Sequence, residues 1–246
     1  MVKTNKGEVM IYFLDCEGFG AVEKSFNFDV KLFTLAVLLG SYLVYNCFNS
    51  LDETAVQQLS MVTELSKKIK ISDDESFDAS SYFPSLFWII RDFHLELVDE
   101  DQIAITNDEY LESALKEQTG YSKEIMERNK IRTLLKTFFK ERHCFTLVRP
   151  AHEEKDIQEL SSGTSKMRVQ FEKQLQELRA LLFNSIKAKS INGVPMTGKS
   201  YLGFVQTIIT ALNEGAVRFK IYNPRIDSNN KGCVGECYGA AKQENI

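Results

Sequence analysis

The chain has 246 residues, of which 43% are hydrophobic and 26% are charged, with 13 glycines and 4 prolines. This composition is typical of a folded globular protein and excludes disordered, collagen-like and low-complexity classes. The 30 Lys and Arg residues against 34 Asp and Glu residues give a net charge of −4, which leaves no basic excess for general nucleic-acid binding.

The N-terminal part of the chain alternates apolar runs of strand and helix character. Residues 9–15 are almost continuously apolar, which predicts a strand of a parallel sheet covered on both faces. Residues 28–39 then predict a buried helix, and residues 42–48 a second strand. The apolar run over 32–48 is just long enough to cross a bilayer, but Gly40 and Ser41 divide it. A helix followed by a strand is therefore favoured over a membrane span.

The same alternation continues to about residue 150. The predicted elements are a helix over 55–69, an acidic Ser-rich loop over 72–81, a strand over 86–90, a helix beginning at Thr106 with Glu109 completing a capping box, a helix over 123–139 and a strand over 143–148. Strands that alternate with helices predict a three-layer α/β domain with a mainly parallel sheet. Beyond about residue 165 only helices are predicted, over 167–186 and 201–212.

The cysteines and the N-terminus bear on the compartment. The chain has five cysteines, an odd number, and their scattered positions do not suggest a disulfide framework. This favours a reducing environment. The first residues have no signal-peptide layout. The sequence therefore predicts a cytoplasmic protein.

A D-x-x-G motif, Asp15 to Gly18, follows the first predicted strand. At the carboxyl end of a strand in a nucleotide-hydrolysing domain, such an Asp can hold Mg²⁺ through water, and the Gly lets its backbone N–H approach the terminal phosphate. Taken alone, the motif also fits a strand that ends in a polar turn.

An Arg91-Asp92 pair follows the strand predicted over 86–90. The carboxylate can accept two hydrogen bonds from guanine, while the planar guanidinium can stack on the base or hold the carboxylate in place. The alternative is an ion pair at the sheet edge, which contributes little to stability when exposed.

A third motif, Gly193 to Ser200, matches the phosphate-binding-loop pattern G-x-x-x-x-G-K-[ST]. A phosphate-binding loop must leave a buried strand, yet the preceding residues 183–192 are polar and Lys-rich. A coincidental match is favoured, with a circularly permuted GTPase as the alternative.

Several blocks together resemble the guanylate-binding protein and atlastin family, large GTPases of the dynamin superfamily: LDCEGFGAVEK, LAVLLGSYLVYN, FPSLFWIIRDFHLEL and CFTLVRPAH. The resemblance runs in register over about residues 9–215. It implies that Asp15 and Gly18 sense Mg²⁺ and the γ-phosphate of GTP, with Asp15 reaching the metal through water. It also implies that Arg91 and Asp92 recognise guanine and that Arg149 and Pro150 belong to the guanine cap. GTP or GDP with Mg²⁺ is the ligand implied, and pairing of two G domains is implied across the nucleotide face.

The resemblance divides the chain into a partial GTPase domain over 1–164, the start of a helical middle domain over 165–222 and a disordered polar tail over 223–246. Family members carry a phosphate-binding loop and a switch I threonine before the D-x-x-G strand, and the 14 residues that precede Asp15 contain neither. We therefore expect a P-loop-GTPase-like fold lacking its N-terminal strand, and a GTPase fragment with impaired activity. The alternative is a catalytically inactive interaction or regulatory paralogue.

Overall fold

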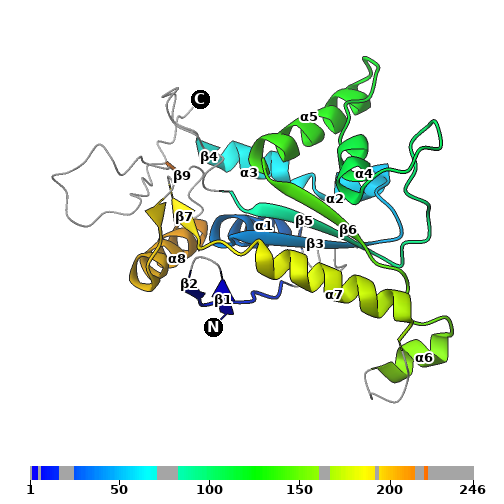
Figure 1. Ribbon diagram of the computed structural model, residues 1–246. Helices are drawn as coiled ribbons and strands as arrows, with labels where there is room; N and C mark the ends of the chain where they lie inside the picture. The colour runs from blue at the N-terminus through cyan, green and yellow to red at the C-terminus, as the bar shows by residue number, and fades with distance from the viewer. Residues whose placement is uncertain are drawn as a thin grey trace.

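The computed structural model describes residues 2–4, 7–16, 25–70, 83–160, 167–191, 194–213 and 219–220. Its centre is a parallel sheet of three strands, whose spatial order is β3-β5-β6 (Figure 1). These strands are β3 (Tyr42–Phe48), β5 (Ser85–Arg91) and β6 (Arg142–Thr146). The register pairs Phe48 with Arg91 and Ile90 with Thr146, so the three strands end at one edge of the sheet.

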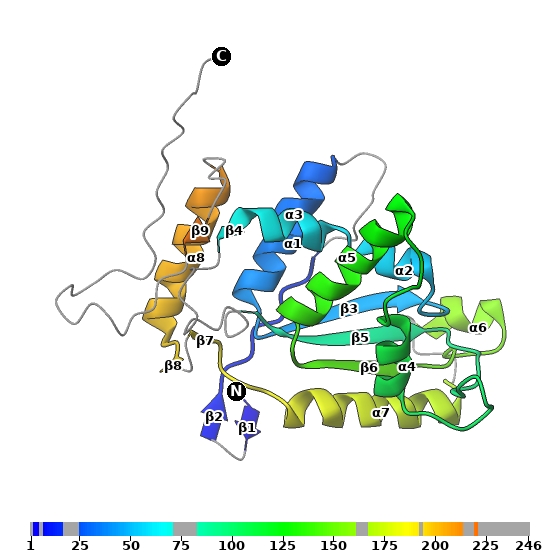
Figure 2. The same cartoon turned by 90° about the horizontal axis from the view of Figure 1, so that it is seen from above.

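Helices cover both faces of this sheet and make three layers, as Figures 1 and 2 show. One face carries α1 (Phe26–Leu39), α2 (Glu53–Gln58), α3 (Met61–Lys68) and α5 (Lys123–Phe138), with α4 (Asn107–Ala114) beside β6. The other face carries α7 (Val169–Asn184). The main core lies under the first group and includes Phe33, Trp88 and Leu135, whereas Ile89, Leu147 and Leu178 form a smaller core under α7. The predicted three-layer α/β architecture with a parallel sheet is confirmed.

The local predictions for the central elements are close to the structure. The strand bounds over 42–48 agree, and α1, β5 and α5 agree within two residues. The capping box before α4 is present, because the Glu109 backbone N–H donates to Thr106 Oγ1 at 3.2 Å and the Thr106 backbone N–H donates to Glu109 Oε2 at 2.7 Å. The strand predicted over 143–148 begins and ends earlier, as β6. The acidic loop over 72–81 and the tail over 223–246 lie outside the described residues.

The strand predicted over residues 9–15 is wrong. The short strand β2 (Gly7–Val9) pairs with β1 (Val2–Thr4) in an antiparallel hairpin, and residues 10–16 form neither helix nor strand. Tyr12 and Phe13 are 75% and 85% exposed. An apolar run predicts burial, but a strand also needs a neighbour with which to share backbone hydrogen bonds. The described strands provide none for residues 10–16.

The single helix predicted over 55–69 is two helices. α2 ends at Gln58, and α3 begins at Met61 after a turn at Leu59. The Leu59 N–H donates to Val56 O at 3.1 Å and the Val62 N–H donates to Leu59 O at 3.0 Å. Because Leu59 and Val62 stay fully buried through this tight turn, the apolar spacing continues unbroken and the sequence pattern does not reveal the turn.

The last long helix, α8 (Gly198–Asn213), lies against α1 (Figure 2). Its residues Ile208 and Leu212 belong to the main core. Two hydrogen bonds tie this region to the end of α1, from Lys189 Nζ to the Gly40 carbonyl at 2.8 Å and from the Tyr201 hydroxyl to the Leu39 carbonyl at 3.2 Å. The helices that follow the predicted boundary at residue 164 therefore pack directly on the α/β layers. None of the helices in the described parts of the chain is both long and apolar enough to cross a membrane.

Candidate functional site

The loops that follow the three central strands are joined at the carboxyl edge of the sheet. Asn49 follows β3 with φ 66°, and Asp92 follows β5 with φ 55°. Asn and Asp adopt this left-handed conformation more readily than most residues with a side chain. The Asn49 N–H donates to the Arg91 carbonyl at 2.9 Å, and the Phe93 N–H donates to the Leu147 carbonyl at 2.9 Å. This edge is where open α/β sheets bind their ligands.

Arg91, the last residue of β5, stacks on an aromatic ring. Its Cζ lies 4.0 Å from the centroid of the Phe48 ring. Its Nε atom is buried and makes no hydrogen bond. The ion pair considered for Arg91 and Asp92 is not among the contacts of the described residues. The dipeptide therefore does not serve as a salt bridge that closes the sheet edge.

The backbone around Asp92 is anchored through its neighbour Phe93. The Phe93 side chain is buried and packs edge-on against Tyr110, with ring centroids 5.7 Å apart. The Tyr110 hydroxyl in turn accepts a hydrogen bond from the Leu51 N–H at 3.2 Å, in the loop after β3. Burial raises the pKa of the Tyr110 hydroxyl, so it stays protonated at neutral pH. The Phe93–Tyr110 contact and this hydrogen bond thus connect the loop after β5 to the loop after β3 through α4.

The segment Arg149-Pro150 follows β6 and is tied to the start of α7. Arg149 pairs with Glu154 of α6 (Glu154–Glu159), while its Nε is buried without a hydrogen-bond partner. The carbonyls of Arg149 and Pro150 accept hydrogen bonds from Arg168, from Nη1 at 3.3 Å and from the backbone N–H at 2.8 Å. Arg168 immediately precedes α7, so this helix fixes the position of the segment.

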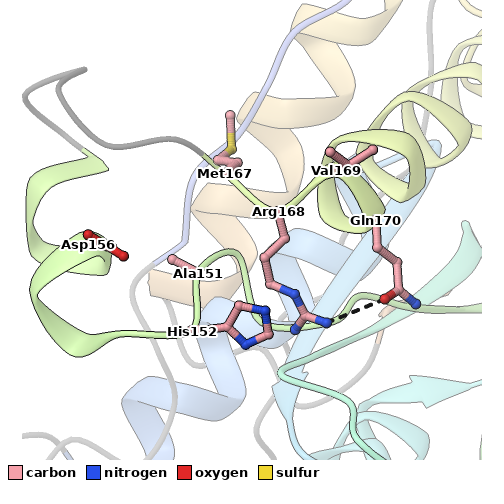
Figure 3. Close-up of a pocket in the computed structure, with 7 residues that line it drawn as sticks. All are labelled: Ala151, His152, Asp156, Met167, Arg168, Val169 and Gln170. Atoms are coloured by element: carbon pink, nitrogen blue, oxygen red, sulfur yellow. Dashed lines mark hydrogen bonds between the residues drawn. The ribbon is translucent and has the colours of Figure 1, made fainter.

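A shallow pocket of about 430 Å³ lies beside this segment, between α6 and the first turn of α7 (Figure 3). Its polar lining includes His152, Asp156, Arg168 and Gln170, and Arg168 Nη2 donates to Gln170 Oε1 at 3.4 Å. The pocket offers both charge signs beside the Arg149 segment. Within it, Arg168 is already engaged by protein oxygens.

Only Asp15 and Cys16 of the D-x-x-G motif are among the described residues. Asp15 is exposed at the end of the irregular segment over 10–16, and Gly18 lies outside the described residues. No hydrogen bond or ion pair of the described residues links Asp15 to Arg91 or Asp92. Of the predicted site residues, Arg91 and Asp92 thus lie at the end of β5, Arg149 and Pro150 follow the neighbouring strand β6, and Asp15 lies on an irregular segment.

A magnesium site built from protein ligands alone is not found among the described residues. They contain no group of three or more His, Cys, Asp or Glu side chains arranged to hold a metal ion. Mg²⁺ accepts such sparse protein ligation, because it keeps several waters and binds through one or two carboxylates together with substrate phosphates. The exposed Asp15 carboxylate fits that role only with the phosphates of a bound nucleotide.

The phosphate-binding-loop match lies outside the parallel sheet. Gly198 and Lys199 begin α8, Lys199 is exposed, and Gly193 is not described. The short strands before the helix, β7 (Ser190–Ile191) and β8 (Val194–Pro195), pair only as an antiparallel hairpin. A phosphate-binding loop requires a buried strand that leads into its helix. This finding argues against the permuted GTPase and favours the coincidental match.

Two residues of this edge were missed by the sequence reasoning. Phe48 ends β3 beside Arg91, and Arg168 binds the carbonyls of Arg149 and Pro150. The signal for Phe48 was available, because parallel strands place their last residues together and Phe48 ends a predicted strand. Arg168 carries no comparable signal, since its role depends on where α7 packs.

The whole N-terminal part of the chain matches a known family. Residues 1–191 match the family model described as "Guanylate-binding protein, N-terminal domain". The chain belongs to the guanylate-binding protein family. The match extends past residue 164 and includes α7, in agreement with the packing of that helix on the sheet.

Individual guanylate-binding proteins are similar to this chain over most of its length. Guanylate-binding protein 5 of Homo sapiens is 33% identical over 211 residues, which cover 82% of this chain and 36% of the relative. Guanylate-binding protein 4 of Homo sapiens is 37% identical over 83% of this chain and 33% of the relative. Guanylate-binding protein 7 of Mus musculus is 35% identical over 87% of this chain and 35% of the relative. The chain thus spans about a third of the length of these relatives.

Proposed function

We propose that this chain provides the guanine-recognising part of a guanylate-binding-protein-like GTPase. The observation that carries the proposal is the position of Arg91 and Asp92 at the carboxyl end of the central strand β5. Membership of the guanylate-binding protein family supports GTP or GDP as the ligand. Mg²⁺ would accompany GTP and neutralise charge on its phosphates.

Each residue has a defined part in this proposal. The Asp92 carboxylate accepts hydrogen bonds from the guanine N1–H and 2-amino groups, and the Arg91 guanidinium stacks on the base. Arg149 and Pro150, after the neighbouring strand, close the base site from the side of β6. Asp15 and Gly18 would serve at the phosphates, with Asp15 reaching Mg²⁺ through water.

We expect Asp92→Asn to weaken binding of GDP but not of ADP. The amide keeps one acceptor oxygen but lacks the charge, and a hydrogen bond to a charged group contributes about 1–3 kcal/mol. Titration of both nucleotides against the wild type, Asp92→Asn and the exposed control Asp101→Asn measures the effect. Equal GDP affinity in Asp92→Asn and the wild type would show that Asp92 does not read guanine.

The polypeptide of residues 1–246 is expected to show no Mg²⁺-dependent GTP hydrolysis. Phosphoryl transfer depends on positioning and on donors aimed at the developing charge, and the loss of one such donor costs about 10²–10³ in rate. Within residues 1–246 the only phosphate-binding-loop match, Gly193 to Ser200, ends in the first turn of α8, and its described residues lie outside the parallel sheet. A phosphate-release assay with Asp15→Ala as the comparison tests this expectation.

The same assay separates the two candidate functions. Turnover by residues 1–246 that Asp15→Ala abolishes would prove this expectation wrong and establish a working GTPase. Guanine-specific binding without turnover would fit a domain that supplies base recognition. The absence of both would favour the alternative of a catalytically inactive interaction or regulatory protein.

A further inference from the structure

The end of β3 presents an aromatic ring directly to the proposed guanine-reading arginine. Phe48 and Arg91 occupy paired positions in the parallel register of β3 and β5, so their side chains lie on the same face of the sheet. The Phe48 ring centroid lies 4.0 Å from Arg91 Cζ, well within the 6 Å range of a cation–π contact. Phe48 is nevertheless 54% exposed, so burial in the core does not explain its position.

Arg91 differs from three other arginines that are at least partly shielded from solvent, and also from Arg168, whose guanidinium donates to protein oxygens. Arg132, Arg142 and Arg149 each pair with a glutamate. Among the described residues no carboxylate pairs with Arg91, and its buried Nε makes no hydrogen bond. The Phe48 ring is therefore the contact that orients the guanidinium plane. A buried donor without a partner is unusual in a folded protein and marks a group that a ligand or water can satisfy.

The backbone at both residues is held in place. Asn49, directly after Phe48, donates its N–H to the Arg91 carbonyl at 2.9 Å. Asn49 and Asp92 both turn the chain through left-handed conformations immediately after the paired residues. The ring and the guanidinium are thus the last side chains of two strands that end in register, and the backbone at both positions cannot shift without disturbing the sheet.

We propose that Phe48 is a positioning residue for guanine recognition. Its ring supports one face of the Arg91 guanidinium and leaves the opposite face to stack on the base of a guanine nucleotide, beside the Asp92 carboxylate. This inference rests on the proposed function, because it assigns Arg91 to the base. The ring acts through Arg91 and need not touch the nucleotide itself.

Substitutions at Phe48 separate an aromatic role from simple packing. Phe48→Leu keeps an apolar side chain but removes the π face, whereas Phe48→Tyr retains it. Val44→Ala is the matched control, because Val44 lies four residues before Phe48 in β3, on the same face of the strand, and is also exposed. Thermal unfolding of all variants checks that each is folded.

The first readout needs no nucleotide. In NMR spectra of the protein, the Arg91 Nε–Hε signal is identified by its loss in Arg91→Lys. A ring stacked on the guanidinium shifts this signal upfield, so we expect a downfield change in Phe48→Leu and no change in Val44→Ala. An unchanged Arg91 signal in Phe48→Leu would overturn the stacking on which the inference depends.

The second readout is a titration with GDP and with ADP. Phe48→Leu should weaken GDP binding about two- to five-fold, which is the loss expected for an exposed cation–π contact. Phe48→Tyr and Val44→Ala should bind GDP like the wild type, and ADP binding should not change. GDP binding unaffected by Phe48→Leu, or equally weakened by Val44→Ala, would overturn the positioning role.

The two proposals fail in different ways. If the wild type prefers GDP to ADP and Asp92→Asn removes that preference while Phe48→Leu does not alter it, only the role of Phe48 is wrong. If the wild type shows no preference for GDP and Asp92→Asn has no effect, the proposed function is wrong and the role of Phe48 falls with it.

Discussion

Glu53→Ala should lower the free energy of unfolding by about 3–5 kcal/mol, the cost of leaving a buried charge without its partner. Arg132 is only 4% exposed, its Nη2 lies 2.6 Å from Glu53 Oε2, and its Nε donates to the Ala114 carbonyl at 3.2 Å. Although burial opposes ionisation, the hydrogen bonds and charges of Arg132 and Arg128 lower the pKa of Glu53. The pair joins α2 to α5. Without Glu53, the buried Arg132 guanidinium has no carboxylate to neutralise its charge.

Urea unfolding at pH 7 measures this effect against two comparison variants. Glu112→Ala breaks the more exposed pair with Arg142 and should cost at most about 1 kcal/mol. Glu53→Ala combined with Arg132→Met removes both charges and should recover part of the loss, because an apolar replacement of a buried pair is often tolerated. A loss in Glu53→Ala no larger than that in Glu112→Ala would contradict the prediction.

The pH dependence of the same pair follows from the lowered pKa of Glu53. Below the ordinary value of 4.5 the unfolded chain takes up a proton before the folded chain does. Stability therefore falls as the pH drops through this range. Glu53→Ala should lose this part of the acid sensitivity.

Lys189→Met should remove a rise in stability that the wild type shows between pH 7 and 8.5. Burial lowers the pKa of Lys189 from 10.5 to about 7, and its Nζ donates to the Gly40 carbonyl at 2.8 Å. Between these two values the unfolded chain binds one proton more than the folded chain, so stability increases with pH. At ~1.4 kcal/mol per pH unit for a full proton of difference, and half a proton at pH 7, the expected rise over this interval is about 1.5 kcal/mol.

Unfolding experiments at several pH values check this prediction. The pH range ends below 9, because burial also raises the pKa of the Cys47 and Cys144 thiols above their ordinary value of 9.0. Near that pH these thiols ionise in the unfolded chain first, which lowers stability and would mask the effect of Lys189. Lys187→Met is the control, since Lys187 is an exposed lysine two residues earlier. If stability depends on pH equally in Lys189→Met and in the wild type, the pKa of Lys189 is not lowered in the folded protein.

The central strands and their motif could be predicted because the relevant signals are local. A run of apolar residues that ends in Arg91-Asp92 indicates a buried strand with polar groups at its carboxyl end. The capping box at Thr106 is likewise a property of four consecutive residues. Parallel pairing then requires the strand ends to meet at one edge, so Arg91 and Asp92 lie beside the ends of β3 and β6 as the alternation predicts.

Other features depend on partners that are distant in the chain. Residues 9–15 have the composition of a strand, but a strand forms only where another strand lies beside it. In the structure β2 pairs with β1, and residues 10–16 form no strand. The contact of Arg91 with Phe48 joins residues 43 positions apart through the register of two strands. The anchoring of Arg149 and Pro150 depends on where α7 docks.

The sequence by itself determined the layer architecture, the bounds of β3, those of β5 to within one residue at each end, the edge at which Arg91 and Asp92 lie, and the family. These follow from apolar periodicity and short motifs, which act over a few residues. Only the tertiary structure decided that the Phe48 ring contacts Arg91, that Lys189 is partly buried against the end of α1, and that residues 194–200 of the phosphate-binding-loop match lie outside the parallel sheet. The reason is physical: burial, cation–π stacking and strand pairing depend on distances between segments that only the packed chain sets.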